Sequence, residues 1–278
     1  MINNHKLAVV TVWYNPTEEV IDNIMSYGSI VDKIYCVDNS DVTNEKYVND
    51  DRIDYIPLRK NTGIATALNI GCQKSIEDGN DIIITFDQDT FCADNTVEKL
   101  AIRTILYDGD VIVAPRIKYI FRKNEQRIFS DEVVLTDLDE NPQWVITSGS
   151  TFKSSTFIKT HGFDEKLFIS QVDQDFCFRI KTNGGEIVRL SDAYIWQEPG
   201  KTETISFLGK TLHIPNLTAS RYYYIFRNEF YLREKWGREY KHYWVKLYKY
   251  TISILFFENS KLEKIRACIK GVKDVREM

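Results

Sequence analysis

The sequence lacks any long apolar segment, which limits how the protein can meet a membrane. None of its 278 residues lie in a stretch that approaches the roughly 20 apolar residues of a membrane-spanning helix. The apolar run Leu7–Trp13 is too short for the core of a signal peptide, and no small-residue cleavage site follows it. We therefore expect a cytoplasmic protein, with at most a peripheral attachment to the inner face of the cell membrane.

Cysteine is scarce and scattered. The five cysteines are odd in number, widely spread and contain no C-x-x-C spacing, so a disulfide scaffold is excluded and reduced core thiols are expected. The chain also lacks internal repeats, low-complexity runs and flexible linkers. Its 43% hydrophobic and 27% charged residues are ordinary for a soluble globular protein.

Charge is unevenly distributed. From Arg221 onward 14 Lys and Arg residues stand against 7 Asp and Glu, whereas the first 220 residues carry 22 against 33. The basic tail is also rich in aromatic residues, so we expect it to meet something anionic. The acidic body argues against nucleic acid as that partner.

The first part of the chain alternates strands and helices, as in a parallel, doubly wound α/β sheet. Ile82–Thr85 are consecutive uncharged β-branched residues, which suit a strand buried on both faces. The expected strands are Leu7–Trp13, Lys33–Val37, Arg52–Pro57, Asp81–Phe86, Val111–Ala114, Trp144–Thr147, Glu186–Leu190 and Ala193–Trp196. The expected helices are 17–28, Ile64–Ile76, Asn95–Tyr107, one from about Val172 to Asn183, and then Leu217–Trp236, Glu239–Phe257 and Lys261–Val275. We predict an α/β domain over residues 1–216 and a helical extension over 217–278.

Acidic side chains follow two of the expected strands: Asp38, and then Asp87 with Asp89. In open α/β sheets ligands gather at the carboxyl ends of strands. Paired carboxylates there can hold a hard divalent cation, with diphosphate oxygens and water in its other positions. A plain Asp-rich turn is the alternative.

Two helix starts could add to such a site. Asn61 and Gly63 precede a helix whose amino end favours anions. Asp173, at the start of another helix, could act as a general base, and Asp38 could accept a hydrogen bond from a nucleobase. Alternatively, Asp173 and Asp175 cap the helix, and Asp175 pairs with Arg179 at spacing i, i+4.

A series of short motifs follows in order along residues 7–232. They are Val12–Pro16, Val37–Ser40, Asn61–Gly71, Phe86–Thr90, Thr147–Ser150, Gly162–Glu165, Val172–Arg179 and Arg221–Asn228. In order and spacing the set resembles inverting family 2 glycosyltransferases. The triplet Asp-Gln-Asp followed by Thr is similar to the bacterial rhamnosyltransferase branch.

The resemblance implies a GT-A fold, with a nucleotide-sugar-binding half over residues 1–115 and an acceptor half over 116–216. It implies dTDP-L-rhamnose as donor and Mg²⁺ or Mn²⁺ as cofactor. The acceptor would be a hydroxyl of a growing, lipid-linked surface polysaccharide such as O-antigen, capsule or cell-wall glycan. The reaction would be a single displacement at the anomeric carbon.

Motif position also implies roles. Asp38 would bind the base, Asp87 the ribose or donor sugar, Asp89 the metal, and Asp173 would be the catalytic base. The other implied donor-binding residues are Val12, Tyr14, Asn15, Asn61, Gly63, Gln88 and Arg221, and Ser148 and Gly149 would bind the acceptor beside Asp173.

Two positions depart from the family pattern. Val172 stands where an acid often precedes the base, and Gln197 stands where a His commonly contacts the metal. Gln197 would offer an uncharged oxygen, or Glu198 or His213 would replace it; the alternative for His213 is a surface histidine. Two alternatives stay open: a UDP-sugar donor, since thymine and uracil present similar edges, and a non-catalytic carbohydrate-binding or scaffold protein.

The aromatic and basic tail has two interpretations. It is either a helical cap whose aromatic residues are core, or a surface resting on an anionic membrane. In the second case its basic residues would meet lipid phosphates. They are Lys246, Lys249, Lys261, Lys264 and Arg266.

Overall fold

The computed structural model describes residues 1–278 apart from 29, 124–125, 134–141, 201–202, 208–209 and 241–242. The chain forms two compact units. The first comprises Met1–Phe168 and Val172–Glu198, and the second comprises Ile169–Gln171 and Pro199–Met278. The domain boundary expected between residues 216 and 217 stays a prediction.

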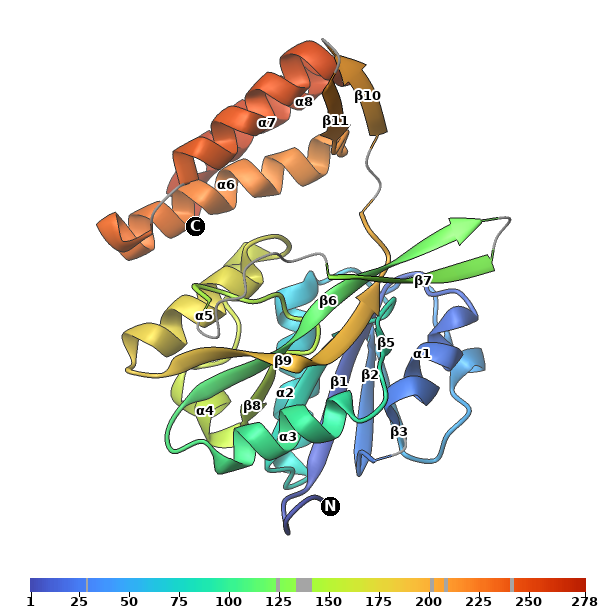
Figure 1. The fold of residues 1–278 in the computed structure, drawn as a ribbon. Coiled ribbons are helices and arrows are strands. Elements are labelled where there is room, and N and C mark those ends of the chain that lie inside the picture. Colours follow the sequence, from blue (N-terminus) through green and yellow to red (C-terminus); the bar gives the residue numbers. More distant parts are fainter. Residues whose placement is uncertain (29, 124–125, 134–141, 201–202, 208–209, 241–242) are drawn as a thin grey trace. The chain divides into compact units, whose positions relative to one another are not determined.

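The first unit is built on one mixed, mostly parallel sheet (Figure 1). Within the described residues its strands run in the order β3-β2-β1-β4-β8-β6-β9-β5, with β7 paired to β6. Strands β3, β2, β1 and β4 are parallel to one another, as are β6 and β9, whereas β8 is antiparallel to β4 and β6. The strands are β1 (Leu7–Trp13), β2 (Lys33–Asp38), β3 (Ile53–Pro57), β4 (Ile82–Asp87), β5 (Phe91–Cys92), β6 (Val111–Lys123), β7 (Gln126–Val133), β8 (Thr151–Lys153) and β9 (Glu186–Gln197).

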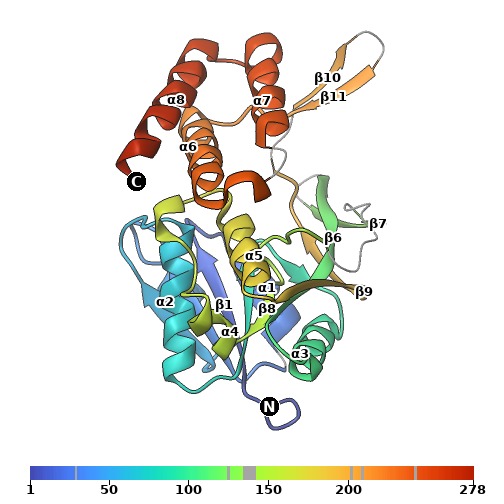
Figure 2. The same ribbon diagram turned by 90° about the vertical axis from the view of Figure 1, so that its left-hand side faces the viewer.

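Helices cover both faces of this sheet (Figure 2). Successive residues of a strand face opposite sides, and Val9 packs in a core with Ile24 and Ala101 on one face. On the other face Gly71 approaches β1 so closely that an added Cβ would overlap Val10. The helices are α1 (Glu19–Gly28), α2 (Ile64–Glu77), α3 (Thr96–Leu106), α4 (Ser154–Lys159) and α5 (Val172–Thr182), with short 3-10 turns η1 (Glu45–Tyr47) and η2 (Glu165–Leu167).

The second unit is mainly helical in its described residues. A core of apolar side chains joins its three helices, including Tyr222, Leu247 and Cys268. The chain offers no helix long and apolar enough to cross a membrane, within the residues that the structure describes. The elements are the hairpin β10 (Glu203–Phe207) and β11 (Lys210–Ile214), helices α6 (Ala219–Trp236), α7 (Tyr243–Phe257) and α8 (Lys261–Asp274), and 3-10 turns η3 (Gly237–Glu239) and η4 (Val275–Glu277).

Most of the expected elements are confirmed, and β1 matches residue for residue. The strand expected at Trp144–Thr147 is wrong, because no residue of that segment is in a strand. The turn at residues 148–149, which follows this segment, is hydrogen-bonded to β4: Gly149 N–H donates to the Thr85 carbonyl at 2.7 Å. The two late strands are one continuous strand, β9. Strand β6 continues past Pro115 through a register shift between Ala114 and Arg116, an irregularity that accommodates a residue without an N–H.

Candidate active site

Two acidic side chains stand on either side of the end of β1. Asp38 is the last residue of β2 and pairs with Trp13, and Asp87 is the last residue of β4 and pairs with Val12. Because parallel strands end at the same edge, the sheet brings both acids to the place where ligands bind in such folds. The structure therefore assembles the strand-end acids as the alternation of strands predicts.

Asp89 lies two residues beyond β4 and is partly buried. Burial and the charge of Asp87 raise the pKa of Asp89 to about 7; Glu198 acts in the same direction and Arg127 opposes it. A carboxylate whose charge is so disfavoured gains most from a nearby cation.

Ser148 and Gly149 hold the residues at and just beyond the end of β4, Asp87–Thr90, which we call the acidic loop. Asp87 N–H donates to Ser148 Oγ at 3.3 Å, and that hydroxyl lies 2.5 Å from Thr90 Oγ1. Gly149 has φ +80°, and a Cβ there would lie 2.5 Å from Pro115 Cγ, so only glycine fits. These two residues, expected to bind the acceptor, thus support the loop that carries the acids.

Gln197 reaches the same loop from the end of β9. Its Nε2 donates to Asp87 Oδ2 at 3.2 Å and to Thr90 Oγ1 at 3.1 Å. Glu198, the alternative ligand, accepts from Arg122 Nε at 2.8 Å. The side chain of His213 lies outside the described residues.

Gln88 ties the acidic loop to the end of β1. Its Oε1 accepts from Tyr14 N–H at 2.7 Å, and its Nε2 donates to the Tyr14 carbonyl at 3.3 Å. Asn23, which the sequence did not single out, donates to the Gln88 carbonyl at 2.7 Å and accepts from Arg127 at 2.9 Å. The backbone turns after Tyr14, where Asn15 has φ +47° and donates to Ser40 Oγ at 2.7 Å.

Asp38 organises the turn after β2. Its carboxylate is 1% exposed; Oδ1 accepts from Ser40 N–H at 3.1 Å, and Oδ2 from Asn44 N–H at 2.9 Å and the Tyr55 hydroxyl at 2.5 Å. Burial raises the pKa of Asp38, but hydrogen bonds from Ser40, Tyr55 and Asn44 outweigh it and lower the pKa, so the group is ionised. Sequence reasoning missed Asn44 and Tyr55, since neither lies in a motif.

The amino end of α2 is fixed by Gly63. This residue has φ +88°, and a Cβ there would lie 2.6 Å from the Phe168 ring. The close approach lets Ile64 N–H donate to the Phe168 carbonyl at 2.7 Å. Asn61 Oδ1 accepts from Gly63 N–H at 3.0 Å and from Asn39 at 3.1 Å. Part of the expected anion site is therefore used by the protein itself.

Asp173 stands in the first turn of α5, and the chain limits where it can lie. Asp173 is five positions beyond Phe168 in the chain, so its Cα lies within roughly 17 Å of Phe168, the residue that contacts the amino end of α2. It is partly exposed, and its Oδ1 accepts from Gln174 N–H at 2.9 Å. The expected ion pair between Asp175 and Arg179 is confirmed at 3.0 Å, with Asp175 fully buried. Asp175 is thus enclosed and paired, whereas Asp173 is partly exposed.

Comparison with known proteins decides the family. The sequence pattern of "Glycosyl transferase family 2" matches residues 14–170, more than half of the chain. The chain belongs to glycosyl transferase family 2. It is a glycosyltransferase, and the expected resemblance is confirmed.

Individual relatives agree with this family. The chain is 27% identical over 248 residues to dTDP-rhamnosyl transferase RfbF of Shigella flexneri, covering 84% of this chain and 81% of that protein. Among solved structures, GalNAc-T7 with UDP, GalNAc and Mn²⁺ superposes with a TM-score of 0.62 at 14% sequence identity. The superposition covers 99% of this chain and 56% of the GalNAc-T7 chain. S. aureus TarS 1–349 with UDP-GlcNAc gives 0.55 at 15% identity over 96% of this chain and 71% of that one. Both structures share the GT-A-type fold that the resemblance implies.

The oxygen-bearing side chains at the end of β4 in this glycosyltransferase suit a divalent cation. The part of the chain that the structure describes holds no group of three or more His, Cys, Asp or Glu placed to bind a metal. It does hold the pair Asp87 and Asp89 with the Gln197 amide beside them. Mg²⁺ is commonly bound by one or two carboxylates, with substrate phosphates and water completing its octahedron. The residues present therefore suit a cation that arrives with a diphosphate.

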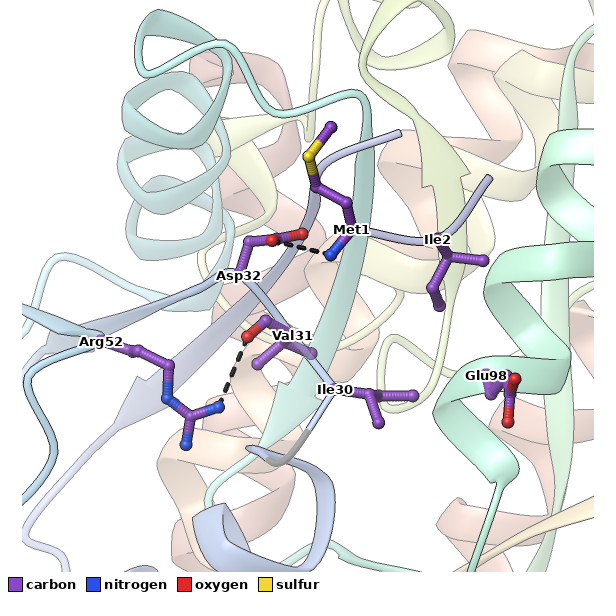
Figure 3. A pocket seen from close by; sticks show the side chains of 7 residues that line it. All are labelled: Met1, Ile2, Ile30, Val31, Asp32, Arg52 and Glu98. Carbon is purple, nitrogen blue, oxygen red and sulfur yellow. Dashed lines mark hydrogen bonds and ion pairs between the residues drawn. The ribbon is translucent and has the colours of Figure 1, made fainter. Parts of the chain in front are cut away.

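A pocket of about 560 Å³ lies elsewhere, beside the residues that precede β1 and β2 (Figure 3). Three of its charged groups have partners: the Met1 amine donates to Asp32 at 2.9 Å, and Arg52 donates to Asp50 at 3.0 Å and to the Val31 carbonyl at 3.4 Å. It lies where the parallel strands begin, away from the edge where they end. We assign it no part in the reaction of the glycosyltransferase.

Proposed function

We propose that this glycosyltransferase moves L-rhamnose from dTDP-L-rhamnose to a hydroxyl of a bacterial surface polysaccharide, with inversion at the anomeric carbon. The observation that carries the donor is the identity to a dTDP-rhamnosyl transferase across 84% of the chain. The pair Asp87 and Asp89 at the end of β4 supports a diphosphate donor.

Asp173 is the base in this proposal. The acceptor oxygen attacks the anomeric carbon, the bond from that carbon to the diphosphate oxygen breaks, and the hydroxyl proton passes to the Asp173 carboxylate. Asp175 cannot take this part, because it is buried and paired with Arg179. Val172 is apolar and offers the base no hydrogen bond.

Asp89 would hold the metal with Gln197, and Asp87 would contact the ribose or sugar. A bound Mg²⁺ or Mn²⁺ supplies positive charge for the departing diphosphate. The Gln197 amide already bridges Asp87 and Thr90, so it fixes the loop in either case.

Asp38 would bind the base through Oδ1, which accepts from Ser40 N–H, whereas Oδ2 accepts from both Asn44 and Tyr55. Exposed Tyr14, the residue that follows β1, would contact the nucleoside. The other proposed donor contacts are Val12, Asn15, Asn61, Gly63, Gln88 and Arg221. Ser148 and Gly149 would act on the acceptor through the loop they support.

A panel of nucleotide sugars tests the donor. Thermal unfolding is followed with dTDP-rhamnose, UDP-GlcNAc and UDP-galactose, each with and without Mn²⁺. Selective stabilisation by dTDP-rhamnose in the presence of metal is expected, because binding to the native state raises the midpoint. Stronger stabilisation by a UDP-sugar would overturn the rhamnose assignment and leave the transferase standing.

The second unit would rest on a membrane that carries a lipid-linked acceptor. Two of the five basic residues expected to meet lipid, Lys246 and Lys264, must be removed from that surface. Lys246 is not available, because it pairs with buried Glu229 at 2.6 Å. Lys264 is 5% exposed and pairs with Glu258 at 2.9 Å, so it cannot meet lipid as expected. The side chains of Tyr243 and Trp244 lie outside the described residues.

Exposed apolar and basic side chains nevertheless share α7 and α8. Leu262, Arg266 and Ile269 are exposed at spacings of four and three, along one stripe of α8. Helix α7 adds exposed Tyr248 and Phe256. Such a mixture suits the headgroup region of an anionic bilayer, where each basic residue contributes about 1 kcal/mol.

Liposome sedimentation tests this surface. Neutralising Lys249, Lys261 and Arg266 should weaken binding to anionic vesicles, and salt should do the same. A control variant neutralises three lysines of the first unit, Lys6, Lys46 and Lys159. Equal loss in both variants, or no binding at low salt, would remove the membrane proposal.

A further inference from the structure

The turn that precedes helix α5 has an unusual backbone. Ser170 has φ +72° and Gln171 has φ +58°, and Phe168 before them has φ +58°. Side chains with a Cβ rarely adopt this region, because Cβ crowds the carbonyl oxygen. Such a run persists only where surrounding groups hold it.

Helix α6 supplies those groups from two consecutive residues. Asn228 Nδ2 donates to the Ile169 carbonyl at 2.9 Å and to the Ser170 carbonyl at 3.0 Å. Gln171 Nε2 donates to Glu229 Oε1 at 2.9 Å. Asn228 and Glu229 are both fully buried, so water does not compete for these bonds. The contacts of Ile169–Gln171 accordingly place this turn in the second unit.

Glu229 is itself held in place. Its carboxylate accepts from the Tyr240 hydroxyl at 2.5 Å and pairs with Lys246 Nζ at 2.6 Å. A buried carboxylate is tolerated when a cation and hydrogen bonds satisfy it. The carboxylate that accepts from Gln171 is therefore also held by Tyr240 and Lys246, which lie outside the turn.

We propose that Asn228 and Glu229 are positioning residues for Asp173. Two residues after Gln171 the chain reaches Asp173, so the path of the turn sets where α5 begins and where its first-turn carboxylate points. Buried, apolar Val172 cannot share that task through a hydrogen bond. Displacing a reacting group by about 1 Å can cost roughly 100-fold in rate. The inference rests on the proposed function, in which Asp173 is the base.

The main test measures kcat, donor affinity and thermal midpoint for Asn228→Ala and Glu229→Gln. We expect kcat to fall about 10- to 100-fold while the donor Kd stays within about twofold, since positioning acts on the chemical step. Gln171→Met removes only the turn's side of the bond to Glu229 and leaves the Glu229 pairs intact. It should lower kcat about tenfold even if the α6 variants fail to fold.

Glu258→Gln is the matched control. Glu258 is a buried carboxylate of the same unit that accepts from Tyr222 and Ser253, both at 2.6 Å, and pairs with Lys264. None of these described partners belongs to the turn. This variant should lower the thermal midpoint and leave kcat within about threefold of wild type, the margin of ordinary context effects.

A double-variant cycle separates positioning from general damage. In an Asp173→Asn background, adding Asn228→Ala should lower the residual rate no further, because the group it positions is gone. An additive effect, or a folded Asn228→Ala protein with wild-type kcat, would overturn the inference. If Asp173→Asn itself turned over at the wild-type rate, the proposed base would be wrong instead.

Discussion

Replacing Asp89 by Asn should stabilise the metal-free protein at alkaline pH while abolishing its response to metal. Burial and Asp87 raise the pKa of Asp89 from its ordinary 3.8 to about 7. Between these values the unfolded chain has lost the proton and the folded chain keeps it, so wild-type stability falls as pH rises through that window. The difference corresponds to about 4 kcal/mol as an upper limit, because the carboxylate is partly exposed and screened by water.

Urea unfolding with a chelator at about pH 5.5 and about pH 8 measures the effect. This step crosses only the upper part of the range between the two pKa values of Asp89, so only part of the upper limit is expected. The stability of the Asn variant relative to wild type should rise by about 2 kcal/mol between the two conditions. Exposed Asp108→Asn is the control and should show no such change. Mn²⁺ at pH 8 should stabilise wild type and leave Asp89→Asn unmoved. A pH-independent difference between wild type and variant would refute the reasoning.

Two further changes test the fold and the loop. Gly71→Ala should destabilise by about 2 kcal/mol, because its Cβ would overlap Val10 and lie 2.9 Å from Val37; Gly79→Ala, at φ +75° with open space, should cost only about 1 kcal/mol. Equal midpoints in denaturant would contradict this. Gln197→Ala should weaken Mn²⁺-dependent donor binding about tenfold in calorimetry, through loss of a ligand or of its support to Asp87; unchanged affinity would exclude both roles.

Strand alternation and the runs of apolar residues were enough to place most of the fold. The failure at Trp144–Thr147 has a physical cause, because a short apolar run reads alike whether it forms a strand or packs as an extended turn. There Val145 is buried and its carbonyl faces Cys177 at 3.7 Å, so tertiary packing decides its state.

The acids of the candidate site could be found in the sequence, but their partners could not. Tyr55 donates to Asp38 across 17 residues of chain, and no local pattern marks such a pairing. Charge counting had the same limit. Under the membrane interpretation of the tail, Lys246 and Lys264 would meet lipid, whereas each is the counterion of a buried glutamate that only the folded unit reveals.

The central claim, metal-assisted transfer with Asp173 as base, is tested most directly by comparing Asp173→Asn with Asp89→Ala. Release of dTDP from dTDP-rhamnose is measured with the acceptor present, alongside donor calorimetry in Mn²⁺. We expect both variants to lose turnover, Asp173→Asn with donor affinity close to wild type and Asp89→Ala with donor affinity strongly reduced. Near wild-type turnover by Asp173→Asn, or undiminished metal-dependent donor binding by Asp89→Ala, would contradict the account.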